Sequence, residues 1–392
     1  MSVSDPAISR LHHLPQKLLT DLLRATPSAH AGADNEPGTW IDAVDWQAVA
    51  QDANDHAIGQ LVYCRLEELG LAEHLPPQVA LAWKADVLHA QLQNALQQRD
   101  ALAISQALTK QQIRHAFAKG FAFREWLYQP AWTRIGGDID IVIDRWNVER
   151  VRALMHELGF IHASGTWDYR EFRPATQAEI DEAESKHHEL AIFVKDYNLK
   201  DAPEWLLGPN FTRRVPFTYE ALASGPVFHS CVDIHWALHF TFADADLLAQ
   251  VEMNGSTSGQ QRPILSLKWN ILFSIFKLYN EAFTRPRYGL THLIDLVALL
   301  EAGEDKLDWT EFETLVGKYQ LESAAFYTLS AVQRLAGKSF VPAPLMAQWS
   351  VLPRNQWTGY GEPSPLDPGD CMPHVLGERL PSYWGWIRRW RN

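Results

Sequence analysis

The stretch "RIGGDIDIVID" (residues 134–144) places two aspartates, Asp138 and Asp140, inside a run of isoleucine and valine. The apolar residues predict a buried β-strand. Side chains in a strand alternate between its two faces, so both carboxylates point one way while Ile139 and Ile141 point the other way. Carboxylates that lie in or beside a core are costly unless a cation or a hydrogen-bond donor pairs with them. The pattern therefore predicts a partner for the two aspartates.

The composition is that of a folded globular protein. The chain has 392 residues, of which 46% are hydrophobic and 11% aromatic, enough for two or three domains. A net charge of -12, with no long basic stripe, disfavours nucleic acid as a partner. The three cysteines, Cys64, Cys231 and Cys371, lie far apart and show no metal-binding spacing, which favours a reducing cytoplasm. The N-terminus does not resemble a signal peptide, and no apolar run approaches the ~18 residues of a transmembrane segment, so we expect a cytoplasmic protein.

Periodicity along the chain predicts an α+β protein with a mixed sheet between two helical regions. Residues 1–112 read as a helical N-terminal region, and residues 113–253 alternate short β-rich runs with helical ones. Helical periodicity returns over residues 264–340, after a polar, glycine-containing linker at Asn254–Pro263. Residues 341–392 are rich in proline, which predicts an irregular tail.

Two further patterns accompany the aspartate strand. In "CVDIHW" (residues 231–236), Asp233 and His235 share one face of a second predicted strand. In "AFAKGFAFREWLY" (residues 116–128), Lys119 and Gly120 lie between a short strand and a helix, where helix N-terminal amides and the lysine charge suit phosphate groups. Three carboxylates and a phosphate-binding turn are typical of a site for a metal-bound polyphosphate.

This ordered set, "AKGFAF…R…GGDIDIVI…VDIHW", resembles the nucleotidyltransferase superfamily, whose members have a polymerase β-like core. More narrowly it is similar to the family described as uncharacterised nucleotidyltransferase, over roughly residues 45–337. The resemblance implies a nucleotidyltransferase-like mixed sheet. Lys119 and Gly120 stand where the superfamily usually has glycine followed by glycine or serine, so the mode of triphosphate binding can differ from that of other superfamily members.

The resemblance also implies a site and a reaction. Asp138 and Asp140 would hold Mg²⁺, or alternatively Mn²⁺, and Asp233 would complete a catalytic metal site. The residues expected to bind the nucleotide are Lys119, Gly120, Arg134, Gly136 and Gly137. The reaction would move a nucleoside monophosphate from a nucleoside triphosphate such as ATP to a hydroxyl of a small molecule or a protein or peptide, releasing pyrophosphate. The alternative is a catalytically inactive nucleotidyltransferase-like module that binds a nucleotide or a partner protein.

Simpler interpretations remain open for most of these residues. The aspartate pair could lie at an exposed strand end. Asp233 could form an ion pair with Arg213 or Arg214, and Lys119 could be an ordinary surface lysine. We expect structural roles for His235, for Asp295, and for the run His187, His188 and Glu189, since adjacent histidines on a strand face opposite sides.

Other reaction classes lack their motifs. The chain has no GxxxxGK[ST] loop and no GxGxxG before a helix, and "GSTSG" has threonine where a nucleophile elbow needs serine. The C-terminal "YWGWIRRWRN" (residues 383–392) combines tryptophan and arginine, which suits weak peripheral contact with a membrane. We favour instead packing of these tryptophans onto the protein's own helices.

Overall fold

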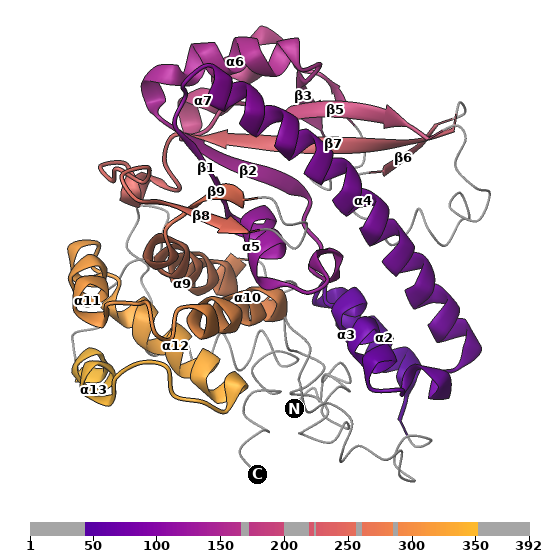
Figure 1. Ribbon diagram of the computed structural model, residues 1–392, viewed down its shortest axis with the longest axis vertical. Coiled ribbons are helices and arrows are strands. Elements are labelled where there is room, and N and C mark those ends of the chain that lie inside the picture. Colours follow the sequence, from indigo (N-terminus) through magenta and orange to yellow (C-terminus); the bar gives the residue numbers. More distant parts are fainter. Residues whose placement is uncertain are drawn as a thin grey trace, which may run out of the picture. The chain divides into compact units, whose positions relative to one another are not determined.

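The computed structural model describes residues 44–165, 172–199, 219–222, 225–255, 261–284 and 289–351 (Figure 1). The chain divides into two compact units. Unit 1 comprises Met1–Ala80 and Leu267–Asn392, and unit 2 comprises Leu81–Ser266. Unit 1 is therefore discontinuous in sequence, because unit 2 is inserted between its two parts.

Unit 1 is helical in the part that the structure describes. Its elements are α2 (Trp46–Asp55), α3 (Gly59–Glu68), the 3-10 turn η3 (Ala72–His74), α9 (Leu267–Thr284), α10 (Gly289–Ala302), α11 (Trp309–Lys318), α12 (Glu322–Ala336) and α13 (Ala343–Val351). Helix α9 packs against α10 and α12 through a buried apolar face that includes Ile271 and Ile275. The hydroxyl of Thr291 in α10 donates a hydrogen bond to the carbonyl oxygen of His56, just after α2. This contact joins the two parts of the unit.

Unit 2 is built around one mixed sheet. Its strands are β1 (His115–Ala118), β2 (Asp138–Ile143), β3 (Ile161–Gly165), β4 (Phe172–Pro174), β5 (Phe193–Asn198), β6 (Tyr219–Leu222), β7 (Gly225–His235), β8 (Val251–Gly255) and β9 (Gln261–Leu265). The order across the sheet is β4-β3-β5-β7-β2-β1-β9-β8, and β6 pairs with β7. Strand β2 runs parallel to β7, and β1 runs parallel to β9, whereas the other neighbours are antiparallel.

The helices of unit 2 are α4 (Pro77–Lys110, which enters the unit at Leu81), α5 (Lys119–Leu127), α6 (Val148–Glu157) and α7 (Gln177–Lys186), with 3-10 turns η4 (Ala131–Thr133), η5 (Arg145–Asn147) and η7 (Phe240–Phe242). Helix α5 packs against β1 and β2, and the rings of Phe117 and Phe121 lie 5.1 Å apart between centroids. Helix α7 begins at a capping box, in which Thr176 and Glu179 exchange side-chain and backbone hydrogen bonds.

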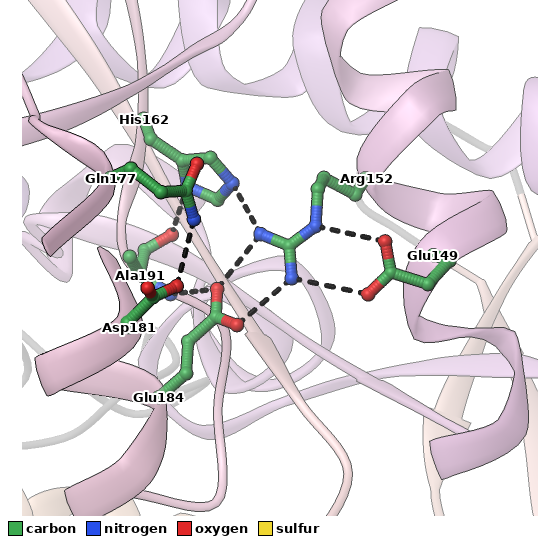
Figure 2. Close-up of polar contacts among 7 residues, drawn as sticks. All are labelled: Glu149, Arg152, His162, Gln177, Asp181, Glu184 and Ala191. Carbon is green, nitrogen blue, oxygen red and sulfur yellow. Dashed lines mark hydrogen bonds and ion pairs between the residues drawn. The ribbon is translucent and has the colours of Figure 1, made fainter.

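A polar network ties α6, α7 and β3 to the segment that leads into β5 (Figure 2). The Arg152 guanidinium of α6 donates to both carboxylate oxygens of Glu184 in α7, each at 2.9 Å. Glu184 also accepts from the Ala191 backbone N–H at 3.3 Å, and the Ala191 carbonyl oxygen lies 2.8 Å from Nδ1 of His162. Residues 187–191, which come directly after α7, also lie beside β7, because the Leu190 N–H donates to the Ile234 carbonyl oxygen and the Trp236 N–H donates to the His188 carbonyl oxygen.

The predicted α+β class with a mixed sheet between helices is confirmed. The structure differs from the expected boundaries at three places. The flanks of the expected linker Asn254–Pro263 belong to β8 and β9, which pair antiparallel with Asn254 opposite Arg262. The expected irregular tail begins with a helix, α13, because Pro342 and Pro344 stand at the start of that helix, where proline is tolerated. Helix α4, expected in the N-terminal region, lies in unit 2 from Leu81 onward.

Candidate active site

The predicted aspartate strands lie side by side. Strands β2 and β7 are parallel neighbours, and their register places Asp140 directly opposite Asp233. Ile139 and Ile141 alternate with the aspartates and are completely buried, as the period of a strand requires. Asp140 is only 2% exposed, which argues against the simpler interpretation of an exposed strand end. The alternation of apolar and acidic residues therefore places a core on one face of the sheet and a carboxylate cluster on the other.

Asp140 is surrounded by cationic groups. The Lys119 ammonium donates a hydrogen bond to Oδ1 of Asp140 at 2.7 Å, and Nε2 of His235 lies 2.9 Å from the same oxygen. Burial alone would raise the pKa of Asp140, but the Lys119 charge and the His235 hydrogen bond outweigh it and hold that pKa well below its usual value. Asp140 is therefore ionised in the folded protein.

Asp233 has the opposite electrostatic environment. Its partial burial, followed by the charges of Asp138, Glu189 and Asp140, raises the pKa of Asp233 well above its usual value. Unlike Asp140, this carboxylate gains little from the neighbouring cations. Several acidic groups thus repel one another here, and a bound cation would relieve that repulsion.

The donor set fits a hard divalent cation. Ligand atoms of Asp140, Asp233 and His235 all lie within 4.8 Å of one another. Carboxylate oxygens from two neighbouring strands are the ligands that Mg²⁺ and Mn²⁺ prefer, and the raised pKa of Asp233 indicates excess negative charge at the same place. Asp140 and Asp233 supply the carboxylates of this group, and the charge of Asp138, at the start of β2, acts on Asp233.

The turn between β1 and α5 brings Lys119 to this cluster. Lys119 has a φ of 52°, a left-handed conformation that costs a non-glycine residue about 1 kcal/mol. Burial lowers the pKa of Lys119, but the charge of Asp140 more than compensates and raises that pKa above its usual value. A glycine at position 119 would relieve the backbone but would leave Asp140 without the ammonium.

Gly120, Arg134 and Gly136 lie together beside this turn. A Cβ atom at Gly120 would lie 2.7 Å from Nη1 of Arg134 and one at Gly136 would lie 3.5 Å from it, so a side chain at position 120 would displace the Arg134 guanidinium. Arg134 is 7% exposed and donates from Nη1 to the Ile135 carbonyl oxygen at 2.6 Å. The predicted residues Lys119, Gly120, Arg134 and Gly136 therefore meet near the N-terminus of α5, where an anion is favoured.

Glu189 is a member of this cluster that the sequence analysis assigned to a structural role. Nδ1 of His235 lies 2.9 Å from Oε2 of Glu189, and a backbone bridge joins the same two residues. Burial and Lys119 lower the pKa of His235, but its hydrogen bond to Asp140 and its close ion-pair contact with Glu189 raise that pKa to about 9. A protonated His235 thus links Glu189 to Asp140. The only sequence signal for Glu189 was its place before the apolar run that leads into β5.

Of the remaining candidates, His188 lies at the cluster, where its ligand atom and those of Glu189 and His235 are within 4.8 Å of one another. The others lie elsewhere or outside the described residues. Asp295 is buried in α10 of unit 1, with Nδ1 of His292 at 3.8 Å from its carboxylate, which agrees with a packing role. His188 lies beside His235, with 6.2 Å between ring centroids. Arg213, Arg214, Cys371 and the tryptophan- and arginine-rich C-terminus lie outside the described residues.

Comparisons with known proteins agree with the resemblance seen in the sequence. The model of a family described as uncharacterised nucleotidyltransferase matches residues 42–337. A search of curated proteins finds no match to the chain. Among the helices that the structure describes, none combines the length and apolar character needed to cross a bilayer.

Proposed function

We propose that this chain, which belongs to the uncharacterised nucleotidyltransferase family, is a Mg²⁺-dependent enzyme that transfers a nucleoside monophosphate to a hydroxyl group and releases pyrophosphate. The family implies a nucleoside triphosphate as substrate. The observation that carries the proposal is the register of β2 and β7, because it sets Asp140 opposite Asp233. The same observation speaks against an inactive binding module, which would have no need of a third carboxylate there.

Each residue of the cluster has its own proposed role in the reaction. Asp138 and Asp140 would hold the ion, and Asp233 supplies a third carboxylate, either as a further ligand or as the acceptor of the hydroxyl proton. When bound, the divalent ion would neutralise phosphate charge and lower the pKa of the attacking hydroxyl. Arg134 and the N-terminus of α5 would hold the phosphates by charge-assisted hydrogen bonds.

The net charge of the protein supports an acceptor other than nucleic acid. The net charge of -12 repels a polyanion, so a small molecule or a protein or peptide is the proposed acceptor. Cys64 and Cys231 are buried free thiols, which suits the cytoplasm that we propose as the location.

The proposal predicts that nucleotide binding depends on the aspartate pair. Calorimetric titration of each nucleoside triphosphate in the presence of Mg²⁺ should give binding to the wild type and none to the double variant Asp138→Ala/Asp140→Ala. Asp144→Asn is the matched control, because Asp144 follows the same strand but pairs with Arg114 at 2.6 Å. Equal nucleotide binding by the wild type and the double variant, or no nucleotide binding by either protein, would refute the proposal.

A second prediction concerns Gly120 and Arg134. Gly120→Ala should weaken triphosphate binding about 10- to 100-fold, because the added Cβ displaces a guanidinium whose hydrogen bonds to a charged group contribute about 1.5–3 kcal/mol. Arg134→Ala should weaken it by a similar factor. The double variant should be no weaker than Arg134→Ala alone, since the guanidinium is then already missing. Independent, additive losses in the same titration would contradict this explanation.

A further inference from the structure

Helix α4 carries two glutamines on its buried side. Gln97 is completely buried and Gln93 is 3% exposed. They are four residues apart, so both project from the same face of the helix. A buried amide without partners destabilises a fold, so each of these side chains needs specific hydrogen bonds.

Both glutamines bind the chain just before the aspartate strand. Nε2 of Gln97 donates to the Gly137 carbonyl oxygen at 3.1 Å, with the Gly136 carbonyl oxygen at 3.5 Å. Nε2 of Gln93 also donates to the Gly136 carbonyl oxygen. These carbonyl groups precede β2. The side chains of α4 give them the hydrogen-bond donors that the backbone of a neighbouring strand would give inside the sheet. The peptide groups directly before Asp138 are therefore held from a helix.

The other end of the Gln97 amide binds α5. Nη1 of Arg124 donates to Oε1 of Gln97 at 2.8 Å, and Arg124 is 2% exposed. A guanidinium can only donate and a carbonyl oxygen can only accept. The opposite orientation of the amide would therefore place two donors together at the Arg124 end and two acceptors together at the glycine end. The contacts thus allow one orientation. Gln97 thereby connects α5, which begins at Lys119, to the glycines that lead into Asp138.

We propose that Gln97 is a positioning residue for the metal and nucleotide site, acting through the Gly136–Gly137 backbone on Asp138. This inference rests on the proposed function and adds a residue from outside the strands and the β1–α5 turn. Asp138 stands at the first position of β2, where the strand ladder alone constrains it least. An amide that fixes the preceding carbonyl groups therefore restricts the direction of its carboxylate. Partners of this kind commonly affect metal affinity about 10- to 100-fold.

Two substitutions distinguish the contacts that the two ends of the Gln97 amide make. Gln97→Met has similar length and removes both contacts. Gln97→Glu keeps an acceptor for Arg124 but removes the donor to the glycine carbonyl groups. Gln98→Met is the matched control, because Gln98 is the next residue of α4 and donates instead to Glu125 at 3.0 Å. Affinity for Mn²⁺ is measured by calorimetry on each full-length protein, and melting temperature is measured in EDTA.

We expect both Gln97 variants to bind Mn²⁺ about 10- to 100-fold more weakly than the wild type, and Gln98→Met to bind as the wild type does. Wild-type affinity in Gln97→Glu would overturn the inference, as would lower melting temperatures with unchanged affinity, which indicate a purely structural role. If Gln97→Met does not fold, the decision rests on Gln97→Glu. Absence of Mn²⁺ binding by the wild type would instead overturn the proposed function, and this inference with it.

Discussion

Replacement of Asp140 by asparagine is expected to lower the rate of pyrophosphate release at least about 1,000-fold. Asparagine has nearly the same size and can still accept hydrogen bonds from Lys119 and His235, which lie 2.7 and 2.9 Å from the carboxylate. It lacks the negative charge that a divalent cation requires. Metal-assisted charge stabilisation contributes several kcal/mol in such reactions, and about 4 kcal/mol corresponds to this factor.

The measurement is a coupled pyrophosphate assay with saturating Mg²⁺ and nucleotide, in the presence of a small molecule or peptide that supplies the acceptor hydroxyl. Asp144→Asn again serves as the control, and circular dichroism verifies that both variants are folded. Turnover by Asp140→Asn within about tenfold of the wild type would show that Asp140 is not a metal ligand, since loss of a directly coordinating charge cannot be that mild.

Replacement of Asp233 by asparagine is expected to have opposite effects on stability and on metal response. In EDTA the melting temperature should rise by a few degrees, because the substitution removes a charge that burial disfavours and that Asp138, Glu189 and Asp140 repel. In Mg²⁺ the wild type should gain stability, since only the folded state offers the ion a site. Asp233→Asn should gain little stability from Mg²⁺. The difference in melting temperature between the two proteins is therefore expected to become smaller or to change sign.

The difference in EDTA should also depend on pH. The raised pKa of Asp233 means that the folded protein binds this proton more tightly than the unfolded chain does. The wild type therefore loses stability as the pH rises from about 4, the ordinary value for aspartate, towards the folded pKa, whereas the asparagine variant does not. Melting curves at pH 5 and pH 8 test this. A larger advantage of the variant at pH 5 would contradict the assignment.

The two strands that carry the aspartates could be predicted because their pattern is local. "DIDIVI" alternates with a period of two, and the same period in "VDIHW" places Asp233 on one face. Apolar runs on either side of Lys119 and Gly120 likewise indicated a strand followed by a helix, and β1 and α5 occupy those positions. Such patterns report which face a residue occupies, and the resemblance supplied the expectation that the two strands meet.

Other parts depend on contacts between distant segments. Gln93 and Gln97 belong to "AQLQNALQQRD", whose polar residues read as a solvated helix surface, yet both are buried because loop carbonyl groups and Arg124 satisfy them. Glu189 reaches His235 only because β7 lies next to the segment after α7. The discontinuous unit 1 was equally hidden, since the periodicity of a helix does not indicate which distant helices it packs against.

The position of β7 between β5 and β2 has a consequence for synthesis of the protein. Strand β2 is complete at Ile143, but its parallel neighbour begins only at Gly225, so a nascent chain presents an apolar strand with one unpaired edge. Such an edge can pair with the same strand of another chain. Asp138 and Asp140 place two like charges on that strand, and their repulsion in an in-register pair opposes self-association. The Asp138→Ala/Asp140→Ala protein should therefore aggregate more during expression, for a reason independent of catalysis.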